Sequence, residues 1–399
     1  MCVAWINRVV IRSAALGLAA GLCLGGCNAV VPPPDNGNGN GNSNANTNDN
    51  GNDNSGELSP AVTFPTSLHA TRAGKNRFYG AENGGFETLT GIPVEQMGCV
   101  KCHEESGMRA DGTTIDSATY VPSCADCHAD PSNPAANAVT EEICLECHSR
   151  QGVEMAALGD VHRDRGFDCT DCHSKREMHG DGTAYMSFLE DGVTDADCEN
   201  CHKEGGIAGV VPTNTAHSIH SEKLDCAACH VQSVSTCYNC HLETIVAGAG
   251  KRFFGPPRTG FKMLMNYKGK VTTATFQALV NKGKSFYVIA PFFGHSIGSS
   301  PACDDCHDSP ALNEYNDTGT ITVTRWDAGQ KTLIGPTGVI PIPPDWQTAI
   351  KMDFLDYTGD PADPNTDASL WTFLKTGADM TQMPFGSPLT DEQMQKLSQ

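Results

Sequence analysis

The sequence predicts a fold made mainly of short α-helices and loops that pack around covalently attached groups, with two small β elements. Two observations predict this fold. The pentapeptide Cys-x-x-Cys-His occurs eight times, and residues 57–399 provide only about 43 residues for each copy. Because that length is too short for a separate domain at each copy, the attached groups must supply much of the core.

Each pentapeptide is the attachment signature of a c-type haem. The two thiols would form thioethers with the porphyrin, and the adjacent histidine would be the proximal ligand of the iron. Zinc sites and disulfides also use Cys-x-x-Cys pairs, but neither needs a histidine after the second cysteine eight times. We therefore predict eight covalent haem c groups, and we number the motifs in chain order.

The attachment cysteines are Cys99 and Cys102, Cys124 and Cys127, Cys144 and Cys147, Cys169 and Cys172, Cys198 and Cys201, Cys226 and Cys229, Cys237 and Cys240, and Cys303 and Cys306. The proximal histidines are His103, His128, His148, His173, His202, His230, His241 and His307.

Six other histidines are candidates for the opposite, distal faces of the irons. They are His69, His162, His179, His217, His220 and His295. A second imidazole makes a six-coordinate iron suited to electron transfer, whereas an open face suits substrate binding. Three of them, His162, His220 and His295, lie six to eight residues before a motif, and we expect each to serve a neighbouring haem. His217 and His220 share one face if helical and could serve two adjacent haems.

Six histidines cannot serve eight irons, so at least two irons must use methionine, lysine, another group or nothing. The best placed methionine is Met383, in the segment MPFGSPLTDEQMQKL. This segment resembles the Met-Pro loop and final helix of single-haem class I cytochromes c, in which the thioether ligand raises the potential. The alternative is that Met383 is a core residue before a helix.

The N-terminal residues predict export. Arg8 and Arg12 precede an apolar run, which is typical of a signal peptide over residues 1–26. The sequence Leu-Gly-Gly before Cys27 resembles a lipoprotein box, so Cys27 is predicted to carry a lipid. An ordinary signal peptide with a coincidental cysteine is the alternative. With Cys27 lipidated, every cysteine of the mature chain is accounted for, and we expect a protein anchored by lipid at the outer membrane or cell surface, on its periplasmic or extracellular face.

The rest of the chain divides into three predicted segments. Residues 27–56 comprise the acylated cysteine and an Asn/Gly-rich linker, whose composition is typical of a flexible tether; an aggregation-prone tract is the alternative. Residues 57–309 form the multihaem domain, with a β insert at about 255–295. Residues 310–399 pack on that domain.

Local patterns place the remaining elements. Runs rich in β-branched and aromatic residues, separated by turn signals at Lys268-Gly269 and Asn281-Lys282-Gly283, predict a small antiparallel sheet between the seventh and eighth motifs. A second β element is predicted at 321–342. Helices are predicted at 139–148 and 194–202, with Thr140 and Thr194 as N-caps, and at 366–399.

The formal net charge is −20. This excess of acidic residues argues against binding to nucleic acid or to anionic lipid through a basic face. It permits cationic partners, such as basic cytochromes or metal cations, and it is equally explained by solubility.

Several segments carry a family resemblance. CHVQSVSTCYNCHLE, APFFGHSI, CDDCH and GVIPIPPDW are similar to segments of multihaem c-type cytochromes, specifically octahaem lipoproteins of anaerobic respiration associated with selenite or tellurite reduction and extracellular electron transfer. The resemblance covers roughly residues 69–399 and implies a multihaem cytochrome c fold. Octahaem enzymes also exist, but this chain lacks the CxxCK variant and the extra helical domain that some of them possess.

Together these observations predict an electron carrier that works with other cytochromes or redox proteins and with a metal or oxyanion as possible terminal acceptor. The alternative is an octahaem reductase that acts on a small oxyanion or a nitrogen or sulfur compound at one five-coordinate haem. Its catalytic residues cannot be named from the sequence. A third possibility is a subunit that polymerises into a wire.

Overall fold

The computed structural model describes residues 58–74, 79–81, 86–93, 109–115, 120–134, 138–202, 215–220, 222–236, 238–247, 254–255, 258–363 and 367–399. From Leu58 onward these residues belong to one compact unit. The predictions for the signal peptide, Cys27, the linker, the first motif with Cys99, Cys102 and His103, and Cys237 fall outside the described residues.

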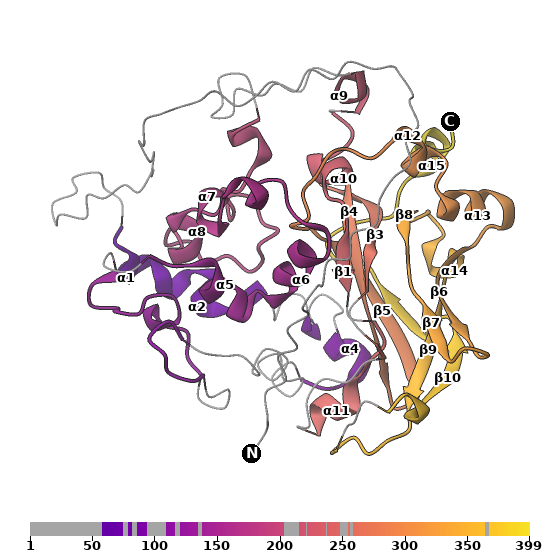
Figure 1. The fold of residues 1–399 in the computed structure, drawn as a ribbon, viewed down its shortest axis with the longest axis horizontal. Coiled ribbons are helices and arrows are strands. Elements are labelled where there is room, and N and C mark those ends of the chain that lie inside the picture. Colours follow the sequence, from indigo (N-terminus) through magenta and orange to yellow (C-terminus); the bar gives the residue numbers. More distant parts are fainter. Residues whose placement is uncertain are drawn as a thin grey trace, which may run out of the picture. The chain divides into compact units, whose positions relative to one another are not determined.

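Short helices and single turns carry the second to sixth motifs and four of the distal histidine candidates (Figure 1). The α-helices are α1 (Pro60–Thr63), α2 (Leu68–Thr71), α4 (Phe86–Thr90), α5 (Glu141–Cys147), α6 (Ser149–Leu158), α7 (Cys169–Cys172), α8 (Lys175–His179), α9 (Thr215–His220) and α10 (Cys226–His230). The 3₁₀ turns are η1 (Phe64–Thr66), η4 (Cys124–Asp126), η6 (Arg163–Arg165) and η7 (Cys198–Asn200). Asp168, Asp197 and Asp225 cap α7, η7 and α10 by accepting a hydrogen bond from the first turn.

A seven-stranded sheet follows. Its strands are β1 (Val234–Thr236), β2 (Cys240–His241), β3 (Arg258–Tyr267), β4 (Lys270–Asn281), β5 (Lys284–Pro291), β8 (Gly338–Pro341) and β11 (Met380–Gln382). The main order is β1-β3-β4-β5-β11, with β2 beside β4 and β8 beside β3. Two-residue turns join β3 to β4 and β4 to β5; both residues of each turn, Lys268-Gly269 and Lys282-Gly283, have positive φ, as tight hairpins require.

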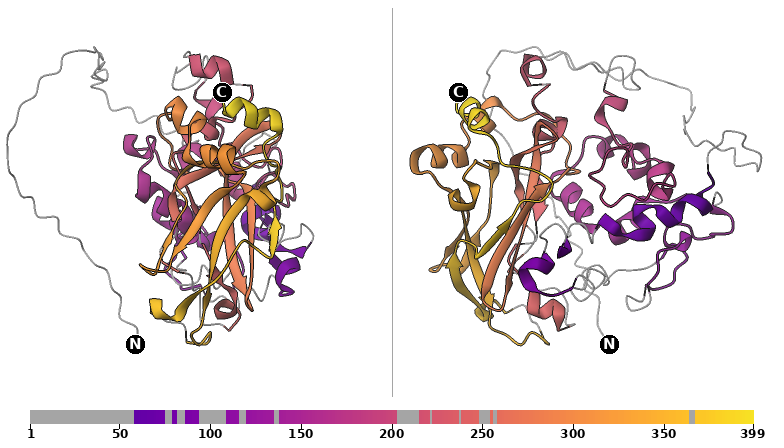
Figure 2. Two further views of the ribbon diagram at one scale, coloured as in Figure 1. Left: turned by 90° about the vertical axis from the view of Figure 1, so that its right-hand side faces the viewer. Right: turned by 180° about the vertical axis from the view of Figure 1, so that it is seen from behind.

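A second sheet of four strands packs against the first (Figure 2). Its order is β10-β9-β6-β7, from β6 (Ile321–Asp327), β7 (Thr332–Ile334), β9 (Ile350–Tyr357) and β10 (Trp371–Thr376). One apolar cluster joins Phe276 and Ile289 of the first sheet to Val323 and Phe354 of the second. The remaining elements are α11 (Leu242–Val246), α12 (Cys303–His307), α13 (Pro310–Thr318), α14 (Trp346–Ala349), η8 (Ala368–Leu370) and α15 (Asp391–Leu397).

The prediction of a fold made mainly of short helices and loops around haems, with only two small β elements, is wrong. Sheets of seven and four strands form a conventional apolar core after residue 230. The average of about 43 residues per motif was misleading because the motifs are unevenly spaced. The second to sixth motifs lie within residues 124–230, whereas the following 169 residues contain only two motifs and can form a core of their own.

The local predictions had mixed outcomes. The helix near 139–148 is confirmed as α5, and the strands and turns between the seventh and eighth motifs are confirmed, within a larger sheet. The helix at 194–202 is only the turn η7, capped by Asp197 instead of Thr194. The prediction of a helix over residues 366–399 is wrong, because the strands β10 and β11 precede the short helix α15 in this segment.

Candidate haem-binding site

Six motifs, the second to sixth and the eighth, share one local structure. Each forms a single helical turn within η4, α5, α7, η7, α10 or α12. In the second to fifth motifs the backbone N–H of the histidine donates to the carbonyl of the first cysteine at 2.8–2.9 Å, for example His128 to Cys124, and in the sixth and eighth the histidine is the last residue of the helix. This turn places the two cysteines, three residues apart, on the same face.

In these six motifs each proximal histidine faces one distal candidate. The pairs, with the distance between ring centroids, are His128 and His179 at 6.0 Å, His148 and His69 at 6.2 Å, His173 and His295 at 6.1 Å, His202 and His162 at 5.9 Å, His230 and His217 at 6.0 Å, and His307 and His220 at 6.3 Å. All six spare histidines are therefore used once, each opposite a different motif.

The constant separation of the rings fits a shared iron. A metal–imidazole bond is about 2 Å long, so two imidazoles on opposite sides of one metal have ring centres about 6 Å apart. The angle between the ring planes ranges from 8° to 66° while the centroid distance stays within 5.9–6.3 Å. Rotation of either ring about a nitrogen–iron–nitrogen axis changes the angle between the planes but leaves the centroid distance unchanged. A shared iron therefore explains a constant distance with a variable angle better than ordinary aromatic packing does. The residues present therefore fit haem c at these six motifs.

Hydrogen bonds at Nδ1 orient several of these rings. His230 donates to the carbonyl of Gly298, and His179 and His220 donate to carbonyls one helical turn earlier, each at 3.0 Å. Because carbonyls only accept, Nδ1 carries the proton and Nε2 remains for the metal.

His173 has a charged partner instead. Its Nδ1 lies 2.9 Å from a carboxylate oxygen of Glu177, one turn later on α8. Burial would raise the pKa of Glu177, but hydrogen bonds from His173, Thr194 and the backbone of Asp195 lower it to about 2. This carboxylate therefore stays ionised beside the candidate proximal ligand of the fourth motif, where it would increase the basicity of the imidazole.

Two further carboxylates hold the backbone next to distal histidines. Glu154, 1% exposed, accepts the N–H of His295 at 3.1 Å and two hydrogen bonds from Ser235 at 2.9 Å. Burial raises its pKa. Asp160 accepts the N–H of His162 at 2.8 Å and that of Ile297 at 3.0 Å. These contacts join the helical region to the sheet.

The cysteines connect the six motifs in sequence. Thiols of successive motifs interact electrostatically: Cys127 with Cys147, Cys144 with Cys169, Cys172 with Cys201, Cys198 with Cys226, and Cys229 with Cys306. None of the cysteines in the described residues forms a disulfide. The attachment points therefore follow one another without a break from the second motif to the sixth and on to the eighth.

The seventh motif has a different structure. Its last two residues, Cys240–His241, form β2 beside β4 instead of a helical turn. Asn239 has φ +56° and its side-chain amide bonds both the N–H and the carbonyl of Leu355 in β9. The Tyr238 hydroxyl donates to the carbonyl of Asp353. The two residues between the cysteines thus belong to the core of the sheets.

His241 lies among different neighbours from the other proximal histidines. It is 3% exposed, and its Nε2 lies 3.3 Å from a carboxylate oxygen of Asp356. Its ring contacts the edges of Tyr357 and Trp371, and no histidine ring among the described residues faces it. This environment does not fit the histidine pairing of the other six motifs.

The structure places Met383 after β11, where it packs against the apolar cluster between the sheets. Each of the paired histidines already has an imidazole opposite. Its role as a ligand stays a prediction, restricted to the first and seventh motifs.

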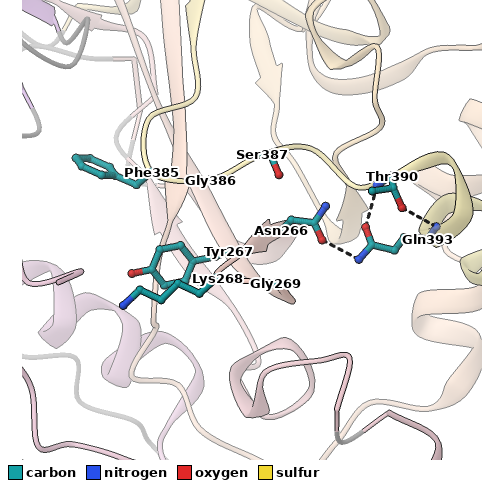
Figure 3. A pocket seen from close by; sticks show the side chains of 9 residues that line it. All are labelled: Asn266, Tyr267, Lys268, Gly269, Phe385, Gly386, Ser387, Thr390 and Gln393. Carbon is teal, nitrogen blue, oxygen red and sulfur yellow. Dashed lines mark hydrogen bonds between the residues drawn. The ribbon is translucent and has the colours of Figure 1, made fainter. Parts of the chain in front are cut away.

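A separate hollow of about 550 Å³ lies beside the β3–β4 turn (Figure 3). It is lined by Asn266, Tyr267, Lys268, Gly269, Phe385, Gly386, Ser387, Thr390 and Gln393. Asn266 and Gln393 hydrogen-bond each other at 2.7 Å, and Thr390 bonds Gln393 at 2.8 and 3.2 Å. Because its lining contains no histidine or cysteine, it is distinct from the haem-binding residues.

Sequence reasoning missed Glu154, Asp160 and Glu177. Glu177 follows His173 by four residues, a spacing that could have identified it. Glu154 bonds residues 81 and 141 positions away, so no local pattern marks it.

Comparisons with protein-family models, with curated proteins and with solved structures found no match. Across the described ranges, no helix has both the length and the apolar character needed to cross a bilayer.

Proposed function

We propose that this protein is an electron-transfer cytochrome whose c-type haems are held by the six histidine pairs. The observation that carries the proposal is the match of every spare histidine to one proximal histidine at 5.9–6.3 Å. Bound haem would supply reversible one-electron chemistry. The chain would supply two imidazoles to the haem at each of these motifs, which would leave its iron no position for substrate.

The cysteine contacts support transfer along the chain. Thioether positions of successive motifs are neighbours from Cys127 and Cys147 to Cys229 and Cys306. Covalent attachment at neighbouring points keeps successive groups close, so electrons would move in short steps in the order of the second, third, fourth, fifth, sixth and eighth motifs. The net charge of −20 favours a basic redox partner. Lipid anchoring through Cys27, export and a metal or oxyanion terminal acceptor remain parts of the proposal.

One observation favours the reductase alternative. All six spare histidines pair with other motifs, so none of these six is left for the irons predicted at the first and seventh motifs. An iron with an open face is where a small oxyanion would bind.

Magnetic and resonance Raman spectra of the oxidised protein test the proposal. We expect at least six low-spin, six-coordinate haems. Replacement of a distal ligand, His179→Ala, should convert one of them to high-spin with no loss of covalent haem, while Lys175→Ala on the same helix should change neither. Mostly high-spin spectra would contradict the electron-transfer proposal. A high-spin fraction near one in eight that binds nitrite, hydroxylamine or cyanide would favour the reductase.

A further inference from the structure

Lys262 of β3 is a buried cation beside two haem-attachment motifs. It is 3% exposed. Its Nζ donates to the carbonyls of Ala228 at 2.8 Å, Val231 at 2.8 Å and Cys229 at 3.3 Å. These carbonyls stand at the C-terminal end of α10, which carries the sixth motif and where helix carbonyls lack partners within the helix.

The three acceptors identify the state of this side chain. An ammonium has three N–H donors and no acceptor, whereas a neutral amine has only two donors. Three carbonyl oxygens around Nζ match the three donors of the ammonium, whose charge they stabilise against the burial that lowers the pKa of Lys262. Lys262 forms no ion pair with a carboxylate among the described residues, so its charge is balanced only by carbonyl dipoles and by more distant groups such as Asp305.

The sixth and eighth motifs meet at this point. Cys306 of the eighth motif packs in the same apolar cluster as Ala228 of the sixth. Lys262 interacts electrostatically with both Cys229 and Cys306. On the distal side one helix, α9, supplies His217 to the sixth motif and His220 to the eighth. The two sites thus share a helix on one side and a buried cation on the other.

We propose that Lys262 raises the reduction potentials of the haems at the sixth and eighth motifs and makes this pair the electron-accepting end of the chain. Reduction adds negative charge, and a positive charge in a region of low dielectric stabilises the reduced state. The fourth motif has the opposite arrangement, because the Glu177 carboxylate accepts from its proximal His173 and favours the oxidised iron. The potential should therefore rise from the middle of the chain towards the eighth motif. This inference rests on the proposed electron-transfer function.

Redox titration of the whole haem-loaded protein, followed by low-temperature magnetic spectra, tests the inference. The signals of the pair are identified as those lost in His217→Ala and His220→Ala. In Lys262→Gln, which keeps a hydrogen-bond donor but no charge, we expect both potentials to fall while the others stay. Lys270→Met is the matched control, because it removes one charge from an exposed position near β3 and should shift neither potential.

Two outcomes would overturn the inference. One is an unchanged potential of the pair in Lys262→Gln; the other is an equal shift in Lys270→Met. If Lys262→Gln does not accumulate as folded protein, Lys262→Arg is the second test. Because it keeps the positive charge, both potentials should stay unchanged; a fall in the potentials would show that packing, not charge, sets them. Covalent haem content and the low-spin spectrum, measured on the same samples, show separately whether the proposed function itself fails.

Discussion

At the scale of single residues, buried carboxylates hold the backbone from which distal histidines project. Glu154 binds β1 through Ser235 and the loop after β5 through the N–H of His295. Removal of such an acceptor leaves buried donors without partners, which costs about 1–3 kcal/mol. Substitution of Glu154 should therefore lower the stability of the protein and also disturb ligation at the fourth motif.

Glu154→Ala should lower the free energy of unfolding by about 1–3 kcal/mol and turn part of one haem high-spin, because His295 loses the contact that positions it. Urea denaturation and magnetic spectra measure the two effects. Glu142→Ala, at an exposed position on α5, is the control. A destabilised Glu154→Ala protein with fully low-spin spectra would show that Glu154 stabilises the fold without positioning His295.

The orientations of the histidine rings give a second residue-scale prediction. The angle between planes is 8–37° in four pairs but 66° for His69 with His148 and 61° for His162 with His202. Nearly parallel imidazoles split the two highest filled iron orbitals strongly, and nearly perpendicular ones split them weakly. Paramagnetic resonance should show four rhombic low-spin signals and two strongly axial ones. An axial signal should be lost in His69→Ala, and a rhombic signal should be lost in His179→Ala. Loss of a rhombic signal in His69→Ala and of an axial signal in His179→Ala would contradict the ring geometry.

At the scale of elements, α9 couples two sites because its two histidines lie three residues apart. Both pairings depend on a helix of six residues, Thr215–His220. Ile219 lies between the two histidines and is 54% exposed, so its side chain contributes little to packing. A change confined to the backbone at this position should therefore affect both ligands together.

Ile219→Pro should convert two haems to high-spin at once, because proline removes a backbone donor and clashes with the preceding turn, at a cost of about 3 kcal/mol or more. Ile219→Ala keeps the helix and should leave all spectra unchanged. Absorption and magnetic spectra distinguish the variants. Conversion of a single haem by Ile219→Pro would mean that His217 and His220 are held independently of α9.

The elements also show what could be predicted from the sequence. Lys268-Gly269 and Lys282-Gly283 mark hairpin turns because both positions need positive φ, which a local pattern reveals. The histidines that pair in the structure were recognisable as candidate ligands by residue type. Their pairing was not, since His295 meets His173 across 122 residues of chain. The strand β11 was missed because its partner, β5, lies almost 90 residues earlier in the sequence and decides its conformation.

At the scale of the whole molecule, the six paired motifs form one continuous series and the seventh stands apart from it. An electrostatic interaction between Cys229 and Cys306 links the sixth motif directly to the eighth. The seventh motif instead contributes Tyr238 and Asn239 to the core between the sheets. The eight identical signatures in the sequence therefore predict attachment chemistry, but they do not predict position in the series.

Interruption of the series should separate the haems into two groups. The double variant Cys198→Ala/Cys201→Ala removes the attachment points of the fifth motif, which interacts with the fourth through Cys172 and with the sixth through Cys226. Rapid-mixing or photoreduction experiments should then show slow equilibration between the haems before and after the gap, instead of one fast phase. The control is Cys240→Ala in the seventh motif, which should leave the fast phase unchanged because that motif is not part of the series. If Cys240→Ala slowed transfer as much as the double variant does, the electron path would have to run through the seventh motif, and the order of motifs proposed from the cysteine contacts would be wrong.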